Sequence, residues 1–198
     1  MRLLRSGITG EKLQLPEGFS LEEALPILKK HFVISLAYQG AVNCGLDPKV
    51  PVMQKILMFY YQILLPHEKQ ALALQELFSA FEENCIPYLP LKGYNLKKRY
   101  PKPEMRPMGD ADILIHLEDY PRIQNMMQSL GFSLNHDTEH VYEWSRDVLH
   151  VELHKMLVGP DAMDFCNYYG TGWQLAQKSD GCRHVLSPEE EYVFWLCI

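Results

Sequence analysis

Apolar residues recur at helical spacing through the first half of the chain. The spacing predicts a helix from Ser20 to about Tyr38, with Ser20-Leu21-Glu22-Glu23 as a capping box and Gly40 as the stop. It predicts two further helices over 52–65 and 67–84, with Pro66 either interrupting the first or beginning the second. Residues 1–19 carry few signals and predict a loose arm. The first third of the chain is therefore expected to be a helical layer.

From residue 85 onward the apolar runs become short and typical of strands. Gly131 ends an amphipathic helix, and Ser187-Pro188-Glu189-Glu190 begins a last helix after an irregular stretch that follows Gly159. The pattern predicts strands over 85–91, 110–116, 132–134, 141–144 and 149–153, and helices over 94–100 and 119–130. We therefore expect an α/β (α+β) fold with a small mixed, twisted sheet and an N-terminal helical layer.

The expected division of the chain follows these changes of pattern. We expect an N-terminal helical region over 1–66, a core over 67–159, and an irregular segment with the start of a C-terminal helical region over 160–198. The last helix is apolar and the sequence stops inside it. This predicts either a truncated C-terminal helical region or an oligomer contact.

Composition narrows the class of protein and its partners. Of 198 residues, 47% are hydrophobic, which suits a globular chain with a sizeable core, and the net charge of −6 does not favour nucleic acid as a partner. A local basic patch around Lys92, Lys97, Lys98 and Arg99 remains. The five cysteines are scattered and form no Cys-x-x-Cys, which argues for a reducing, cytoplasmic compartment. No apolar run reaches about 18 residues, so no membrane association is predicted.

The candidate chemistry centres on Gly109-Asp110-Ala111-Asp112. On a strand, Asp110 and Asp112 point to the same face, where two carboxylates repel each other unless a cation lies between them. Hard divalent cations such as Mg²⁺ take carboxylate oxygens, and two-metal phosphoryl-transfer sites use such shared carboxylates. The alternative is ordinary turn chemistry, because Gly-Asp before a strand is common.

Several motifs together carry a resemblance to a known family. They are Leu91-Lys92-Gly93, Arg106, Gly109-Asp110-Ala111-Asp112 with the apolar run that follows, and Val151-Glu152-Leu153-His154. Over about 68–196 the chain resembles the bacterial uncharacterised nucleotidyltransferase family of the DNA polymerase β-like superfamily. The resemblance implies a nucleotidyltransferase-like core and the transfer of a nucleoside monophosphate from an NTP, such as ATP, to a hydroxyl acceptor, with pyrophosphate leaving.

The resemblance also implies roles for individual residues. Asp110, Asp112 and Glu152 would be the catalytic carboxylates and would hold two Mg²⁺ (or Mn²⁺) ions. Lys92 and Gly93 would seat the nucleotide phosphates, although the superfamily commonly has Gly-Ser or Gly-Gly where this chain has Gly93-Tyr94. The remaining two residues leave alternatives open. Arg106 would clamp the triphosphate or form an ion pair with Asp110 or Glu104, and His154 would contact phosphate or orient Glu152.

Two further functions remain open at this point. A non-catalytic nucleotide-binding or protein-interaction module would explain Gly93-Tyr94 as a decayed phosphate site. A zinc-dependent hydrolase would use His150 and His154, with His140 nearby. Each motif also has a plain explanation: a turn glycine, a surface lysine and an edge-strand glutamate in solvent. P-loop and Rossmann sites are unlikely because their glycine motifs are absent.

Overall fold

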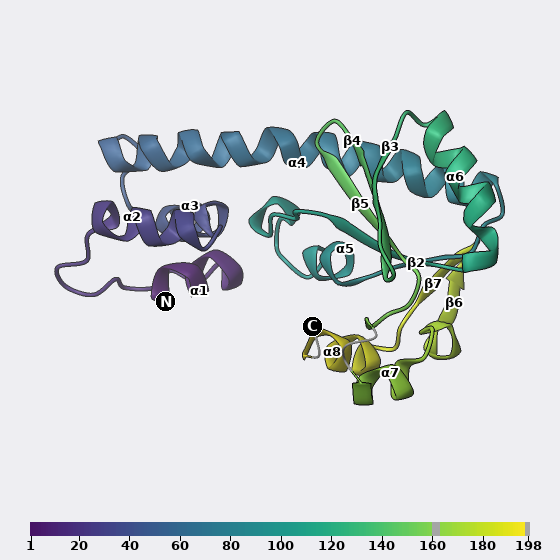
Figure 1. Cartoon of the computed structure of the whole chain (residues 1–198). Coiled ribbons are helices and arrows are strands. Elements are labelled where there is room, and N and C mark those ends of the chain that lie inside the picture. The colour runs from purple at the N-terminus through teal and green to yellow at the C-terminus, as the bar shows by residue number, and fades with distance from the viewer. Residues whose placement is uncertain (160–162, 197–198) are drawn as a thin grey trace. The chain divides into compact units, whose positions relative to one another are not determined.

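The computed structural model describes residues 1–159 and 163–196. The chain divides into two compact units, one of Met1–Glu68 with Leu96–Pro107 and one of Lys69–Asn95 with Met108–Ile198. The first is helical, and the second contains the sheet (Figure 1). The predicted domain boundaries, after residues 66 and 159, stay predictions.

The first unit begins with three helices, α1 (Arg2–Thr9), α2 (Leu21–Lys30) and α3 (Ile34–Asn43). The single helix predicted from Ser20 to Tyr38 is wrong, although the Ser20 cap is confirmed by a bond from the Glu23 N–H to its hydroxyl. The chain turns at Phe32, which has φ of 55°. The Val33 N–H then donates a hydrogen bond to the Leu28 carbonyl at the end of α2. Helices usually end this way at glycine, so the pattern gave no sign of this stop.

Two glycines explain why α1 and α3 pack so closely. A Cβ added to Gly40 would lie 2.0 Å from the Leu3 carbonyl oxygen, and one added to Gly7 would lie 2.3 Å from the Leu36 carbonyl oxygen. Gly40 therefore serves as a helix contact inside α3, and its predicted role as a helix stop is wrong. The loose arm predicted over 1–19 is also wrong in part, because Leu3 of α1 is buried in this core.

The long helix α4 (Pro51–Glu83) runs unbroken through 33 residues, with Pro66 in its interior. The predicted interruption at Pro66 is therefore wrong. Proline removes one helical hydrogen bond, and here its ring is exposed, so water can reach the carbonyl that loses its partner. The first part of α4 packs inward through Met53 and Ile56.

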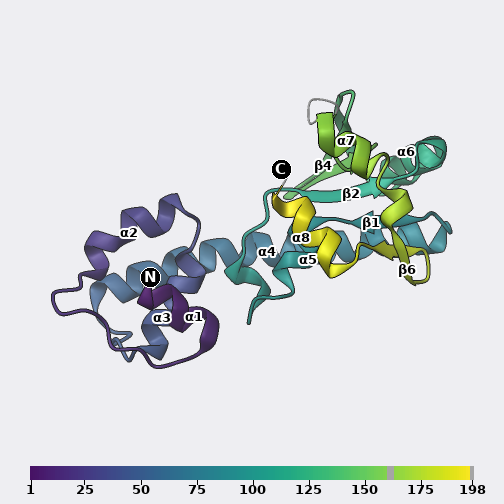
Figure 2. The same cartoon turned by 90° about the horizontal axis from the view of Figure 1, so that it is seen from below.

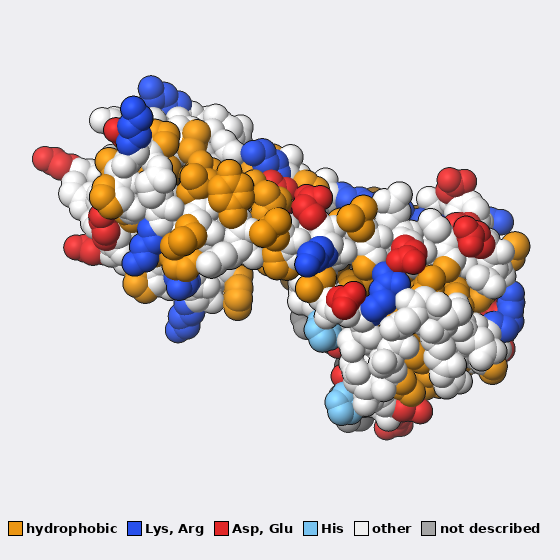
Figure 3. Space-filling model, turned by 90° about the horizontal axis from the view of Figure 1, so that it is seen from above, with side chains coloured by type: hydrophobic (Ala, Val, Ile, Leu, Met, Phe, Trp, Pro, Cys, Tyr) orange, Lys and Arg blue, Asp and Glu red, His pale blue; other side chains and the backbone are white. Residues whose placement is uncertain are grey.

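An apolar stripe of α4 remains at the surface of the first unit. Met58, Tyr61 and Leu65 are each more than half exposed, and their spacing places them on one helix face. Figure 3 shows apolar side chains gathered over this helix. The oligomer contact predicted above concerned the last helix and not this stripe, and it stays a prediction.

Within the described residues, seven strands of the second unit form one mixed sheet in the order β3-β4-β5-β2-β1-β7-β6. Two neighbouring pairs, β2 with β5 and β1 with β7, are parallel, and the others are antiparallel. The predicted α/β fold with a mixed sheet is confirmed. The strands are β1 (Tyr88–Pro90), β2 (Ala111–Ile115), β3 (Ser133–Asp137), β4 (Val141–Arg146), β5 (Leu149–His154), β6 (Gln177–Asp180) and β7 (Arg183–Val185).

Short helices complete the second unit and its connections. They are α5 (Lys92–Lys97), α6 (Tyr120–Ser129), α7 (Met163–Tyr169), α8 (Pro188–Leu196) and the 3₁₀ turns Pro103–Met105, Leu117–Asp119 and Trp173–Leu175. The cap predicted for the last helix is confirmed, since the Glu190 N–H donates to the Ser187 hydroxyl. The region beyond Gly159, predicted to be irregular, contains α7 and the hairpin β6–β7, while 160–162 lie outside the described residues.

The two faces of the sheet are covered differently. One face packs Ile113, Val151 and their neighbours against α4 and α6. The other packs Leu89 and Leu114 against Tyr169 of α7 and Phe194 of α8, which lie beside β1 and β2 (Figure 2). The face under α7 and α8 also carries polar side chains, so this face is where a site can form. No helix within 1–159 and 163–196 combines the length and apolar character needed to cross a bilayer.

We predict that Gly40→Ala destabilises the first unit. Alanine normally favours a helix over glycine by about 1 kcal/mol, but the added Cβ would collide with the backbone of α1. The net loss should be about 1–3 kcal/mol in the free energy of unfolding, measured by urea titration followed by circular dichroism. The control is Gly109→Ala, whose added Cβ meets no atom of the described part of the chain within 4 Å. Equal effects of the two substitutions would contradict this account.

Candidate functional site

The site is built on two adjacent parallel strands, β2 and β5. Their register pairs Asp112 with Glu152, and Leu114 with His154. Because side chains alternate along a strand, Ile113 and Leu153 enter the core against α4 and α6, while Asp112, Glu152 and His154 share the opposite face. Two carboxylates from residues 40 positions apart thus become direct neighbours.

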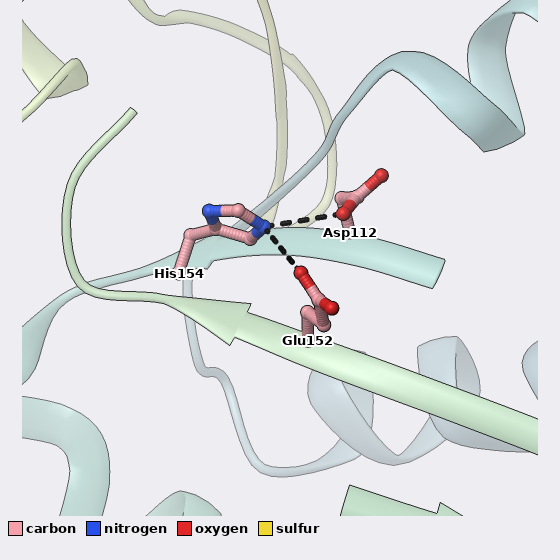
Figure 4. A group of neighbouring side chains, drawn as sticks. All are labelled: Asp112, Glu152 and His154. Atoms are coloured by element: carbon pink, nitrogen blue, oxygen red, sulfur yellow. Dashed lines mark hydrogen bonds and ion pairs between the residues drawn. The ribbon is translucent and has the colours of Figure 1, made fainter. Parts of the chain in front are cut away.

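The three side chains converge on one point (Figure 4). Nε2 of His154 lies 3.2 Å from Oδ1 of Asp112 and 3.5 Å from Oε2 of Glu152. One ligand atom from each residue lies within 4.8 Å of the others, so the group can hold a metal ion. Asp112 and His154 are only 4% and 8% exposed. The second oxygen of Asp112, Oδ2, is buried and has no hydrogen-bond partner within the described residues.

A cavity of about 320 Å³ opens over this group. Its lining includes four carboxylates and one lysine, namely Asp110, Asp112, Glu143, Glu152 and Lys92. Glu143 of β4 stands directly opposite Glu152, and the sequence reasoning did not single it out. Alternation along 141–144 could have placed it on a strand face, but only the strand pairing shows which face. The excess of negative charge makes the cavity suited to cations.

The charges of the site shift the pKa values of its groups. Burial, followed by the charges of Asp112 and Glu152, raises the pKa of Asp110, and Lys92 offsets part of this. Burial by itself lowers the pKa of His154, but the hydrogen bonds and charges of Asp112 and Glu152 outweigh it and raise the pKa overall. Burial and the neighbouring His154 lower the pKa of His140.

Lys92 and Gly93 lie at the start of α5, directly after β1. The helix begins at Lys92 and not at Tyr94 as predicted, so Gly93 belongs to its first turn. A Cβ on Gly93 would lie 3.3 Å from Cγ of Met108 and 3.5 Å from the Asp110 carbonyl oxygen. The Leu91 N–H donates to the Asp112 carbonyl oxygen at 2.9 Å. Glycine therefore lets this turn lie against the segment that carries Asp110.

Arg106 lies in the first unit, whereas the cavity lies in the second. Burial, and to a smaller extent the charge of Arg106, lower the pKa of Lys97 to about 8. Nε of Arg106 is buried and has no hydrogen-bond partner within the described residues. Glu104, the ion-pair partner considered for it, accepts a hydrogen bond from the Tyr60 hydroxyl. The predicted contact of Arg106 with phosphate stays a prediction.

The histidines are arranged differently from the pair considered for zinc. His150 is exposed and lines a neighbouring cavity with Asn135 and Glu143. The ligand group found in the described residues contains His154 and does not include His150. The ring next to His154 is that of His140, edge to face at 5.0 Å between centroids. Nε2 of His140 is 3.0 Å from the Met156 carbonyl oxygen.

Comparison with known proteins identifies the family of the chain. A family model described as an uncharacterised nucleotidyltransferase matches residues 17–198. Since the match spans most of the sequence, the chain belongs to this family, and the resemblance noted in the sequence is confirmed. Searches of curated proteins and of solved structures returned no match.

We predict that the metal-free protein titrates at His154 above the ordinary value of about 6.5. The stabilisation from protonated His154 is complete below that value and is lost as pH rises through the raised pKa of the folded state. NMR titration of the imidazole should show the raised midpoint, and Asp112→Asn should lower it. Asp180→Asn, on the exposed strand β6, should not move it. A wild-type midpoint at or below 6.5 would contradict the contacts described here.

Proposed function

We propose that this chain transfers a nucleoside monophosphate from an NTP to a hydroxyl acceptor in a metal-dependent reaction. The observation that carries the proposal is the pairing of Asp112 with Glu152 on adjacent parallel strands, next to a cavity that also contains Asp110 and Lys92. Membership of a nucleotidyltransferase family supports the reaction class. Fold alone would not give the reaction, so the constellation of carboxylates is the main support.

The residues present fit a divalent metal ion. The donors are carboxylate oxygens with one imidazole. Oδ2 of Asp112 is buried and has no partner among the residues that the structure describes, a costly state for a carboxylate unless a cation compensates it. In the proposal, Asp110, Asp112 and Glu152 hold Mg²⁺ or Mn²⁺. Such ions, when bound, neutralise charge on the phosphate oxygens and orient the attacking and leaving groups.

The protein's own side chains are assigned the proton transfer and the positioning of the reacting groups. Glu152, which is half-buried at the cavity, accepts the proton of the acceptor hydroxyl. The hydroxyl oxygen forms a bond to the α-phosphorus, and the bond from that phosphorus to the bridging oxygen breaks, releasing pyrophosphate. We assign His154 the role of orienting Glu152 before the ion binds, since Nε2 lies 3.5 Å from Oε2.

The phosphates of the NTP are assigned to the other side of the cavity. Lys92 lines the cavity and supplies a positive charge there. Gly93 has no side chain, so the first turn of α5 can approach a phosphate closely. Arg106 is proposed to steady the triphosphate, because a guanidinium group binds phosphate oxygens in pairs.

The charge of the cavity bears on the acceptor. Because Lys92 and the bound ions would be occupied by the NTP phosphates, the remaining carboxylates of the cavity would repel the phosphate backbone of an RNA end. A neutral or cationic hydroxyl compound suits this lining better, which agrees with the net charge of −6.

The four cysteines within the described residues are free, in keeping with the expected reducing, cytoplasmic compartment.

The first test is nucleotide binding. Titration calorimetry with ATP, GTP, CTP and UTP, each with and without Mg²⁺ or Mn²⁺, should show metal-dependent binding of at least one NTP. Asp112→Asn should weaken that binding about tenfold or more, because a buried charge that meets the ion is removed. Asp180→Asn is the matched control, since the same change at an exposed position of β6 should leave binding unaltered.

The second test separates an enzyme from a binding module. Incubation with an NTP labelled at the α-phosphate and a metabolite extract should transfer label to an acceptor, with Asp112→Asn inactive. Metal-dependent binding without any transfer would favour the non-catalytic module. If a folded sample binds none of the four NTPs at millimolar concentration, the proposed function is wrong.

A further inference from the structure

The role of orienting Glu152 accounts for only one of the two carboxylates that Nε2 of His154 approaches. His154 is 8% exposed, and its Nε2 is turned toward the two carboxylates. Figure 4 shows the imidazole at the same point where Asp112 and Glu152 converge. A residue that only contacted phosphate would not need to lie between them.

The spacing of the three donor atoms suits one ion. Metal–nitrogen and metal–oxygen bonds of about 2.1 Å place adjacent ligands of an octahedral ion about 3 Å apart. Nε2 of His154 lies 3.2 Å from Oδ1 of Asp112 and 3.5 Å from Oε2 of Glu152, and all three donors fall within 4.8 Å. Only small shifts are needed for all three to reach a common ion.

The three donor side chains stand on paired strands, and some of their polar atoms lack a hydrogen-bond partner within the described residues. Each comes from β2 or β5, which are central in the sheet and paired through four registered positions. Two atoms have no hydrogen-bond partner within the described residues, Oδ2 of Asp112 and Nδ1 of His154. A hydrogen bond to His154 satisfies only one oxygen of Asp112, so the imidazole alone does not complete the site.

The donor types select among metals. Mg²⁺ prefers oxygen ligands, whereas an imidazole ligand favours the first-row transition ions as a group. Mn²⁺ is the member of that group that carboxylate ligands suit as well. We propose that His154 is a metal ligand that, with Asp112 and Glu152, makes this site prefer a transition-metal ion of the Mn²⁺ class over Mg²⁺. The inference rests on the proposed function for the use of that ion in catalysis, and on the structure alone for the ion's binding.

The test uses Mn²⁺ itself as the probe, with the full chain and no nucleotide. Electron paramagnetic resonance should show Mn²⁺ binding at least about tenfold tighter than Mg²⁺, with Mg²⁺ measured by competition. The electron spin-echo spectrum of bound Mn²⁺ should show modulation by a directly bonded imidazole nitrogen. Absence of this nitrogen signal from the wild-type protein would overturn the inference. This result comes from the wild-type protein alone, so it does not depend on whether a variant folds.

Variants locate the nitrogen. His154→Ala should remove the nitrogen signal and weaken Mn²⁺ binding about tenfold or more, with little change for Mg²⁺. His154→Gln keeps a hydrogen-bonding group but should also lose the signal and the preference, which separates a ligand from a residue that only positions Asp112. His150→Ala is the matched control, because His150 shares the strand and face of His154 and is exposed. An unchanged preference in folded His154→Ala, or loss of the signal in His150→Ala, would contradict the assignment.

The outcomes remain separate from those of the proposed function. Nitrogen-coupled Mn²⁺ binding in a protein that binds no NTP would refute the function and keep the metal site. Metal-dependent NTP binding with no nitrogen signal would refute only the role assigned to His154.

Discussion

Repulsion between Asp112 and Glu152 is the constraint around which the second unit is arranged. The β2–β5 register makes these two carboxylates direct neighbours, and Asp112 is almost fully buried. Like charges directly opposite on paired strands are destabilising, and burial strengthens the effect. Asp110 and Glu143 add negative charge from the same cavity, against one lysine. A cation, or the proton that His154 holds more tightly than usual, is what can compensate this charge.

The opposite face of the same strands makes this concentration of charge tolerable. Ile113, Val151 and Leu153 are fully buried against α4 and α6, and burial of each such side chain stabilises by roughly 1.5–3 kcal/mol. The strands therefore stay in register even though their other face carries unsatisfied groups. The packing of Phe194 and Leu114 closes one end of that face and leaves the polar end to the cavity. A site of this kind is held by the core beneath it.

Three local signals along the chain were misleading because packing or solvent overrode them. Gly40 looked like a helix stop, yet it is the position where the Leu3 carbonyl passes too close for any side chain. Pro66 looked like a break, yet its ring faces water inside a continuous helix. Phe32 lies inside the range predicted as one helix, yet it is 71% exposed in a left-handed turn. In each case the residue type is common in one structural role, and the tertiary structure uses it in a different one.

The sequence by itself determined the fold class, most strands and both helix caps, because period-two and period-3.6 patterns and capping residues act locally. It also pointed to Asp110, Asp112 and Glu152, although β2 begins at Ala111, so Asp110 precedes the strand that was predicted to carry it. Only the tertiary structure decided that β5 lies beside β2, which brings Glu152 and His154 to Asp112, and that β4 adds Glu143. Strand order and register depend on long-range pairing between segments tens of residues apart, and no local pattern in the chain specifies such pairing.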